Sequence, residues 1–121
     1  DVTTISLCHG PNALRSAALE GDFPYSGYKI RMFPDSVDEW TPHIGYLPGY
    51  ITEAMKPEAN IKALGVQVEN TAMDDSVQVD RELVTGASQQ AAQNLAFAAL
   101  GVLVTKFDFQ VALPSGALAI V

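Results

Sequence analysis

The first twenty residues of the chain constrain its fold more than any other segment does. Residues 2–7 are rich in β-branched and apolar types, and so short a run, bounded by turn residues, is typical of a buried parallel strand. Cys8-His9-Gly10 follows at once, and Pro11 suits the first turn of a helix that apolar residues at helical spacing extend to Glu20. A strand, a sharp turn with a nucleophile and a helix make a nucleophile elbow, so the segment predicts an α/β fold with Cys8 at its apex.

The later elements follow from alternation, caps and breakers. A second strand is predicted over 29–33, so that residues 2–33 have the size of a strand–helix–strand unit. In chain order the others are a helix over 37–40 capped by the turn at 34–36, a helix over 50–56 that stops before Pro57, edge or hairpin strands over 66–68 and 77–79, a strand over 82–85, and a helix that Ser88 caps and Gly101 ends. Residues 102–105 either extend that helix or begin a strand, and residues 107–111 alternate as a strand would.

Composition limits the class of protein. At 121 residues, with 48% hydrophobic and 17% charged residues, the chain suits one globular domain, and it has no internal repeat or linker. A net charge of -7 opposes binding to a nucleic-acid backbone or an anionic membrane surface, and no apolar run is long enough to span a membrane. We expect a cytoplasmic protein. Because Asp1 and Val2 lead straight into a strand without an initiator methionine, we expect a fragment.

Cys8 is the single cysteine, so an intrachain disulfide is impossible. At the apex of an elbow its sulfur faces backbone N–H groups and the positive end of a helix dipole, which favour the thiolate over the thiol. The same N–H groups suit an oxyanion. The alternative is a small apolar residue at a strand end. The adjacent His9, oriented by a carboxylate, would complete the parts of a Cys-His-Asp site.

The carboxylate of such a site would follow the second strand. In a right-handed strand–helix–strand unit both strands end at one edge of the sheet, so Asp35 or Asp38 would approach Cys8. Asp35 is otherwise a helix cap and Asp38 a solvated helix residue, and the pattern leaves both open. His43 has no second His or Cys at metal-ligand spacing, so no metal is predicted. Three aromatic residues either pack or line a cleft, and Asp74-Asp75 is interpreted as a solvated turn: Trp40, Tyr46 and Tyr50.

Four blocks of the sequence occur in the same order in one known family. They are residues 5–11 at the elbow, 21–38 through the acidic turn, 44–49 in the next loop, and 80–88 at the last strand and helix start. These blocks resemble the glyoxalase III and heat-shock chaperone (protein deglycase) branch of the ThiJ/PfpI superfamily. The resemblance implies a flavodoxin-like (class I glutamine amidotransferase-like) α/β sandwich, incomplete in this chain. Residues 1–100 would be the carboxyl-terminal part of that domain, and residues 101–121 an unmatched tail of the same unit.

The resemblance also implies a chemistry. Cys8, His9 and Asp38 would form the catalytic triad, with His9 transferring protons, Asp38 orienting it, and Gly10 contacting the substrate. The activity would be that of a glyoxalase III-type lyase (D-lactate dehydratase), converting methylglyoxal to lactate without glutathione or another cofactor, or of a deglycase hydrolase acting on glycated protein. The resemblance further implies that the missing amino-terminal segment is a partner of this chain and that the protein forms a homodimer. It also implies a role in the stress response.

Two other functions stay open at the level of sequence. One is a holding chaperone for unfolded proteins, whose activity would survive replacement of Cys8. The other is an inactive fragment. Sensitivity to thiol alkylation separates the enzyme from the chaperone.

Overall fold

The computed structural model describes residues 2–107, in which the strands form two sheets. The larger sheet has the order β1-β5-β4 and the smaller pairs β2 with β3. β1 is parallel to β5, with Leu7 beside Gly86, whereas β4 is antiparallel to β5 and joins it by a tight turn. The bounds are β1 Thr4–Leu7, β2 Lys29–Ile30, β3 Gln67–Val68, β4 Val77–Asp80 and β5 Leu83–Gly86.

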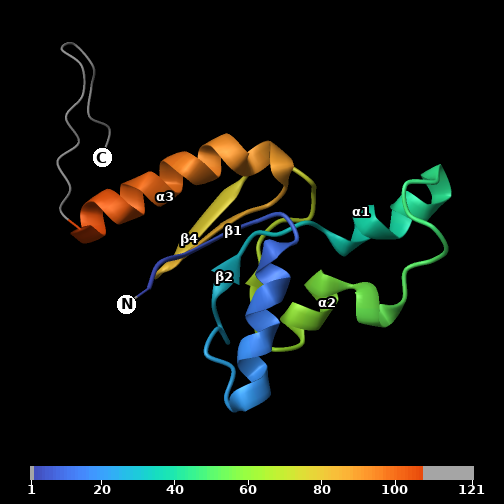
Figure 1. Cartoon of the computed structure of the whole chain (residues 1–121), viewed down its shortest axis with the longest axis horizontal. Helices are drawn as coiled ribbons and strands as arrows, with labels where there is room; N and C mark the ends of the chain where they lie inside the picture. The colour runs from blue at the N-terminus through green and yellow to red at the C-terminus, as the bar shows by residue number, and fades with distance from the viewer. Residues whose placement is uncertain (1, 108–121) are drawn as a thin grey trace, which may run out of the picture.

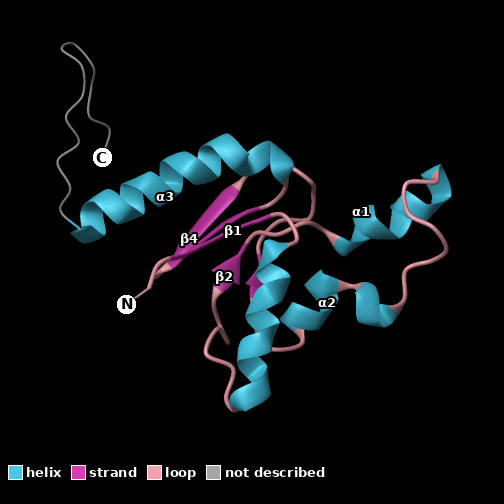
Figure 2. Cartoon of the chain, viewed as in Figure 1, coloured by secondary structure: helices cyan, strands magenta, loops and turns pink. Residues whose placement is uncertain are grey.

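Helices lie on both sides of the strands (Figures 1 and 2). The long α3 packs along β1, β4 and β5, while the 3-10 helix η1 packs against β1 and α2 on the other side. The arrangement is an α/β sandwich of the flavodoxin-like kind, incomplete in this chain, as predicted. The bounds are η1 Gly10–Glu20, α1 Asp35–Trp40, η2 Thr41–Ile44, η3 Glu53–Met55, α2 Pro57–Lys62, η4 Gln89–Ala91 and α3 Ala92–Phe107.

The hydrophobic core gathers side chains from the strands and from α2. Its fully buried members include Ile30, Met32, Ile61 and Leu83, none of which exposes measurable surface. Burying one aliphatic side chain of this size contributes about 1.5–3 kcal/mol. Partly buried side chains from η1, β3 and the loop between η1 and β2 pack against this cluster: Leu14, Phe23, Tyr25 and Val68. The core therefore joins η1 and the strands into a scaffold for the turn between them.

The strand–helix–strand unit predicted over residues 2–33 is divided between the two sheets. β1 pairs with β5, and β2 is shorter than predicted and pairs with β3. The segment after β2 nevertheless runs beside the turn after β1, because the Phe33 N–H donates to the Cys8 carbonyl at 2.9 Å. The Arg31 N–H likewise donates to Thr85 Oγ1 of β5 at 2.8 Å. These bonds bring the acidic turn at residues 34–38 to the end of β1.

Two predicted helix boundaries are wrong. Pro57 does not end a helix over 50–56; a short 3-10 turn at 53–55 precedes it, and α2 begins at Pro57. A proline at the first helical position loses only an N–H that has no helical partner there. Gly101 lies inside α3, which continues to Phe107. A single helical glycine costs about 1 kcal/mol relative to alanine, less than the packing of a long helix supplies.

Other predictions for the second half of the chain stand. Ser88 caps the last helical segment, since its Oγ accepts a bond from the Gln90 N–H at 3.1 Å. Residues 102–105 extend α3 rather than begin a strand. Phe107, the first residue of the strand predicted over 107–111, belongs to α3, and residues 108–111 lie outside the described residues.

Candidate active site

Cys8 occupies the sharp turn between β1 and η1. Its φ is 61°, in the left-handed region that residues other than glycine seldom adopt. Its N–H donates to the Gly86 carbonyl and its carbonyl accepts from the Phe33 N–H, each at 2.9 Å. A non-glycine residue in this region costs about 1 kcal/mol or more, which these flanking bonds offset. The backbone therefore presents Cys8 in the geometry of a nucleophile elbow.

Gly10 allows the helix to start directly against β1. A Cβ atom at this position would stand 2.5 Å from Ser6 Oγ, a separation that real Cβ atoms essentially never show. Gly10 is exposed and opens η1, two residues after the nucleophile. A larger residue would push the start of η1 away from the strand and move Cys8 with it.

His9 connects the Cys8 sulfur to the Asp38 carboxylate. Its Nε2 lies 2.7 Å from Asp38 Oδ2, and its Nδ1 lies 3.4 Å from Cys8 Sγ. The imidazole also stacks on Phe33, with ring centroids 4.4 Å apart and planes 25° apart. With the proton on Nε2, the ring donates to Asp38 and leaves the Nδ1 lone pair facing the thiol. The structure thus brings together all three residues that were predicted to react.

Asp35, the other carboxylate that the pattern left open, lies elsewhere. Its Oδ1 accepts from the Glu58 N–H at 2.9 Å and its Oδ2 from the Ala59 N–H at 2.8 Å. It caps α2, not the helix that follows it as predicted, and α1 includes Asp35 itself. Both carboxylate oxygens are occupied, so Asp38 alone of the pair is placed to orient His9.

Gln89 is a further residue at the sulfur, and sequence reasoning missed it. The Cys8 thiol donates to Gln89 Oε1 at 4.0 Å, and Gln89 Nε2 donates to Met73 Sδ at 3.7 Å. Polar residues at helix starts are usually solvated, so the glutamine carries no motif. The signal that would have found it is the pairing of β1 with β5, because parallel neighbours end at one edge and Gln89 opens the helix after β5.

Comparison with known proteins finds curated proteins that are similar to this chain. No family model matches the chain. The chain is 44% identical over 95 residues to the protein/nucleic acid deglycase HchA of Escherichia coli (strain K12 / DH10B) and to protein/nucleic acid deglycase 1 of Escherichia coli (strain K12), and 43% identical to HchA of Escherichia coli O1:K1 / APEC. Over these 95 residues the chain is similar to the deglycase branch of the ThiJ/PfpI superfamily.

The extent of the match is partial. Each alignment covers 78% of this chain and 32% of the relative, so the chain spans about a third of the length of the curated relatives it matches. The fold resembles that of the crystal structure of APC35852, with a TM-score of 0.67 and 22% identity over 85% of this chain and 45% of that one. The fold of this chain therefore corresponds to less than half of that larger structure.

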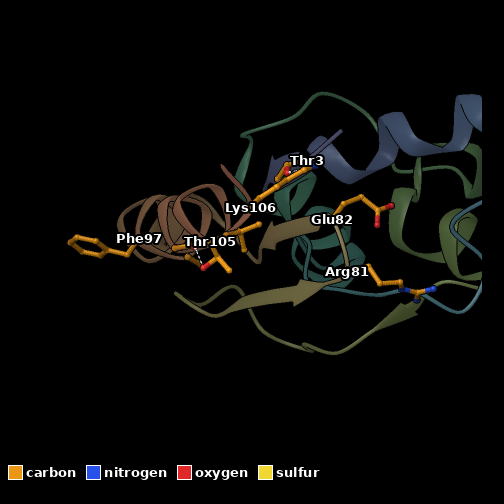
Figure 3. Close-up of a pocket in the computed structure, with 9 residues that line it drawn as sticks. Thr3, Arg81, Glu82, Phe97, Thr105 and Lys106 are labelled. Carbon is orange, nitrogen blue, oxygen red and sulfur yellow. Dashed lines mark hydrogen bonds between the residues drawn. The ribbon is translucent and has the colours of Figure 1, made fainter. Parts of the chain in front are cut away.

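An open pocket lies at the opposite end of the strands from Cys8 (Figure 3). It is lined by Thr3 before β1, by Arg81 and Glu82 in the turn between β4 and β5, and by α3 residues around Phe97 and Thr105. Ligands of α/β sheets bind outside the carboxyl ends of the parallel strands, where Cys8 lies, and not at the amino ends. The candidate active site is therefore the one at Cys8.

The loop after α1 exposes aromatic side chains rather than packing them. Trp40, Tyr46 and Tyr50 are 59%, 76% and 78% exposed. Tyr50 and His43 line one small pocket, which agrees with the cleft-lining alternative for Tyr50. We call residues 40–50 the aromatic loop; this segment begins at the last residue of α1 and includes η2.

Asp74 is hydrogen-bonded rather than merely solvated as predicted. The Ser76 hydroxyl and the Ser76 N–H both donate to its carboxylate. These two bonds, the hydroxyl bond more than the N–H bond, lower the pKa of Asp74. Its backbone carbonyl accepts from the buried Ser88 hydroxyl at 2.7 Å. Asp74 thereby fixes the start of the segment that carries Gln89.

Among residues 2–107 there is no group of three or more His, Cys, Asp or Glu side chains that could hold a metal ion. No helix in that part of the chain is both long and apolar enough to cross a membrane.

Proposed function

We propose that this chain carries the reactive centre of a glutathione-independent glyoxalase and protein deglycase, acting through Cys8, His9 and Asp38. The observation that supports it most is the continuous contact from sulfur to imidazole to carboxylate at a strained elbow. The names of the relatives, protein/nucleic acid deglycases, support the deglycase part of this proposal. A net charge of -7 favours small dicarbonyls and glycated protein over nucleic acid.

The first step is activation of the thiol. His9 Nδ1 takes the Cys8 proton, while Asp38 accepts the Nε2–H bond and stabilises the imidazolium that forms. The thiolate lone pair then forms a bond to the aldehyde carbon of methylglyoxal. The π electrons of that carbonyl move to its oxygen, which takes the proton back from His9. The product is a neutral hemithioacetal on Cys8.

The second step is an internal oxidation and reduction of the bound carbons. His9 removes the hydrogen of the former aldehyde carbon as a proton, the electron pair of that C–H bond forms a double bond to the neighbouring carbon, and the ketone oxygen is protonated to give an enediol. The neighbouring carbon then takes a proton from His9 while the hydroxyl of the first carbon loses its proton and becomes a carbonyl. The first carbon becomes a thioester and the second a secondary alcohol. Water then cleaves the thioester, which releases lactate and restores the thiol. The sum is methylglyoxal plus water giving lactate, and no external electron carrier enters.

For a glycated protein the first step is an exchange. The aldehyde carbon is already joined to a protein thiol or amine as a reversible adduct; as the Cys8 thiolate bonds to that carbon, the bond from the carbon to the protein atom breaks, and that atom takes the proton from His9, which frees the protein. The remaining steps are those of the free dicarbonyl. One nucleophile therefore serves both activities.

The site is expected to need further protein to be complete. β1 pairs with β5 on one side only, so within the described residues it is an edge of its sheet, and Ile5 on it is 46% exposed. Parallel strands are normally buried on both sides. Because the match covers only 32% of the relatives, we propose that an amino-terminal segment covers this edge and that the whole assembles as a homodimer.

The test is turnover by the full-length natural protein and its Cys8→Ser variant. Methylglyoxal loss and lactate formation are followed together, without glutathione. We expect equal rates of the two in the natural protein and a loss of at least about a thousandfold in the variant, since removing a nucleophile typically costs that much or more. Turnover that survives Cys8→Ser would reject the proposal.

A holding chaperone is the second candidate, and the aromatic loop favours it. Exposed Trp40, Tyr46 and Tyr50 give an apolar surface that unfolded segments bind. Suppression of aggregation of a heated client protein should then be unaffected by Cys8→Ser and weakened by replacing the three aromatic residues with serine. The reverse pattern would exclude this function.

A further inference from the structure

We propose that Gln89 is a substrate-binding residue that donates a hydrogen bond to the carbonyl oxygen of the substrate attached to Cys8. The inference rests on the function proposed above and adds a fourth side chain to its site. The starting observation is that Gln89 Oε1 lies 4.0 Å from Cys8 Sγ although the two residues are 81 positions apart in the chain.

The backbone at Gln89 is held firmly. Ser88, which is fully buried, accepts from the Gln90 N–H at 3.1 Å and donates to the Asp74 carbonyl at 2.7 Å. On the other side of the elbow the Cys8 N–H donates to Gly86, three residues before Gln89. The separation between the backbone of Gln89 and the backbone of Cys8 is thus fixed by the pairing of β1 with β5 and by the helix cap.

The side chain of Gln89, in contrast, is exposed and weakly held. Its Nε2 donates to the thioether of Met73 at 3.7 Å, and a thioether is a poor acceptor. A carboxamide presents an acceptor at one end and two N–H donors at the other, so a half-turn of its terminal torsion exchanges them. Little is lost when Nε2 leaves Met73 for a better acceptor.

The substrate oxygen is that better acceptor. At 4.0 Å the carboxamide is at the outer limit of a bond to sulfur. When the Cys8 sulfur lone pair forms the bond to a carbonyl carbon, the π pair moves to an oxygen one atom beyond that carbon. The oxygen then stands between the sulfur and the carboxamide and takes a hydrogen bond from Nε2. His9, at 3.4 Å from the same sulfur, supplies the proton that neutralises it.

The test separates binding of the substrate oxygen from reactivity of the thiol. Iodoacetamide alkylates Cys8 by displacing iodide, a reaction in which no carbonyl oxygen becomes negative. Acetaldehyde adds to a thiol reversibly and has no second carbonyl group, so it protects Cys8 from alkylation without being converted. The concentration of acetaldehyde that halves the alkylation rate measures the stability of the adduct. The full-length natural protein is compared with Gln89→Ala, Gln89→Glu and Gln90→Ala.

Gln90→Ala is the matched control, because Gln90 is the neighbouring exposed glutamine and contributes its backbone N–H to the cap. We expect Gln89→Ala to raise the half-protecting acetaldehyde concentration by about threefold to tenfold, the range of one hydrogen bond, and Gln89→Glu to raise it at least as much. Alkylation without acetaldehyde should change by less than about twofold in Gln89→Ala. Gln90→Ala should match the natural protein in both measurements.

Two results would overturn the inference. One is a half-protecting concentration in Gln89→Ala equal to that in Gln90→Ala. The other is a parallel fall in alkylation without acetaldehyde, which would assign Gln89 to the thiol itself. Neither measurement requires turnover, so a failure of the proposed function, seen as turnover that survives Cys8→Ser, is told apart from a failure at Gln89.

Discussion

Asp35 and Glu58 each accept a hydrogen bond from the backbone of the other residue. The Asp35 carboxylate accepts from the Glu58 and Ala59 N–H groups at the start of α2, and Glu58 Oε2 accepts from the Asp35 N–H at the start of α1. The unpaired donors of two helix starts are satisfied by one reciprocal contact. It fixes α1, and with it Asp38, one turn further along.

Asp35→Ala tests this contact as a determinant of stability. The change leaves two N–H groups of a partly buried helix start without their acceptor, so the free energy of unfolding should fall by about 1–3 kcal/mol. Urea unfolding of the full-length protein measures it. A loss below about 0.5 kcal/mol, the level of an ordinary surface substitution, would contradict the role.

Asp38→Asn tests the second acidic residue of the same helix in the opposite sense. The carboxamide fills the same space, so stability should change little, while methylglyoxal turnover should fall by about a hundredfold to ten-thousandfold because His9 loses its orienting carboxylate. Asp35→Asn serves as the matched control for turnover. Equal losses of turnover in the two variants would assign Asp38 a purely structural role.

The sequence could predict the elbow but not the choice between these two carboxylates. Strand, Cys8 and helix are local signals, and the structure reproduces them. Asp35 and Asp38 lie three residues apart on one short helix, and which of them meets His9 depends on α2, whose start at Pro57 the pattern placed wrongly. Gln89 was missed for a related reason, because its approach depends on strand pairing across 81 positions.

Gly10→Ala should show how closely η1 approaches β1. The new Cβ would meet Ser6 Oγ at 2.5 Å, and overpacking of this kind costs about 1–3 kcal/mol. In a Ser6→Ala background the obstructing hydroxyl is absent, and the same substitution should cost at least about 1 kcal/mol less. Urea unfolding of the two single variants and the double variant gives this coupling energy. Additive losses would mean that the hydroxyl is not the obstacle.

Asp80 should contribute to stability in a pH-dependent way. The Arg81 guanidinium and the Lys29 N–H bind its carboxylate and lower its pKa in the folded protein. The unfolded chain therefore binds a proton more readily, so this contribution is complete above the ordinary Asp pKa of about 4 and is lost as pH falls through the lowered folded value. Unfolding free energy measured from about pH 6 to pH 2 should decline less steeply in Asp80→Asn. Identical slopes would contradict the assignment.

Cys8→Gly and Cys8→Ala should separate backbone strain from side-chain loss. Both substitutions remove the thiol, but only glycine adopts a φ of 61° without steric strain. The glycine variant should therefore be more stable than the alanine variant by about 1 kcal/mol in urea unfolding. An alanine variant of equal or greater stability would show that the turn carries no strain.

The positive φ at Cys8 also bears on how this position would change over generations. Folding alone would favour glycine there, and under the proposed function the chemistry at the sulfur is what keeps a cysteine in that place. A lineage that no longer needed the reaction should drift to glycine at position 8 while keeping Gly86, whose lack of a side chain is required by contact with Leu7 and Ala91. Residue 8 among descendants of this chain would then record which of them still work as catalysts.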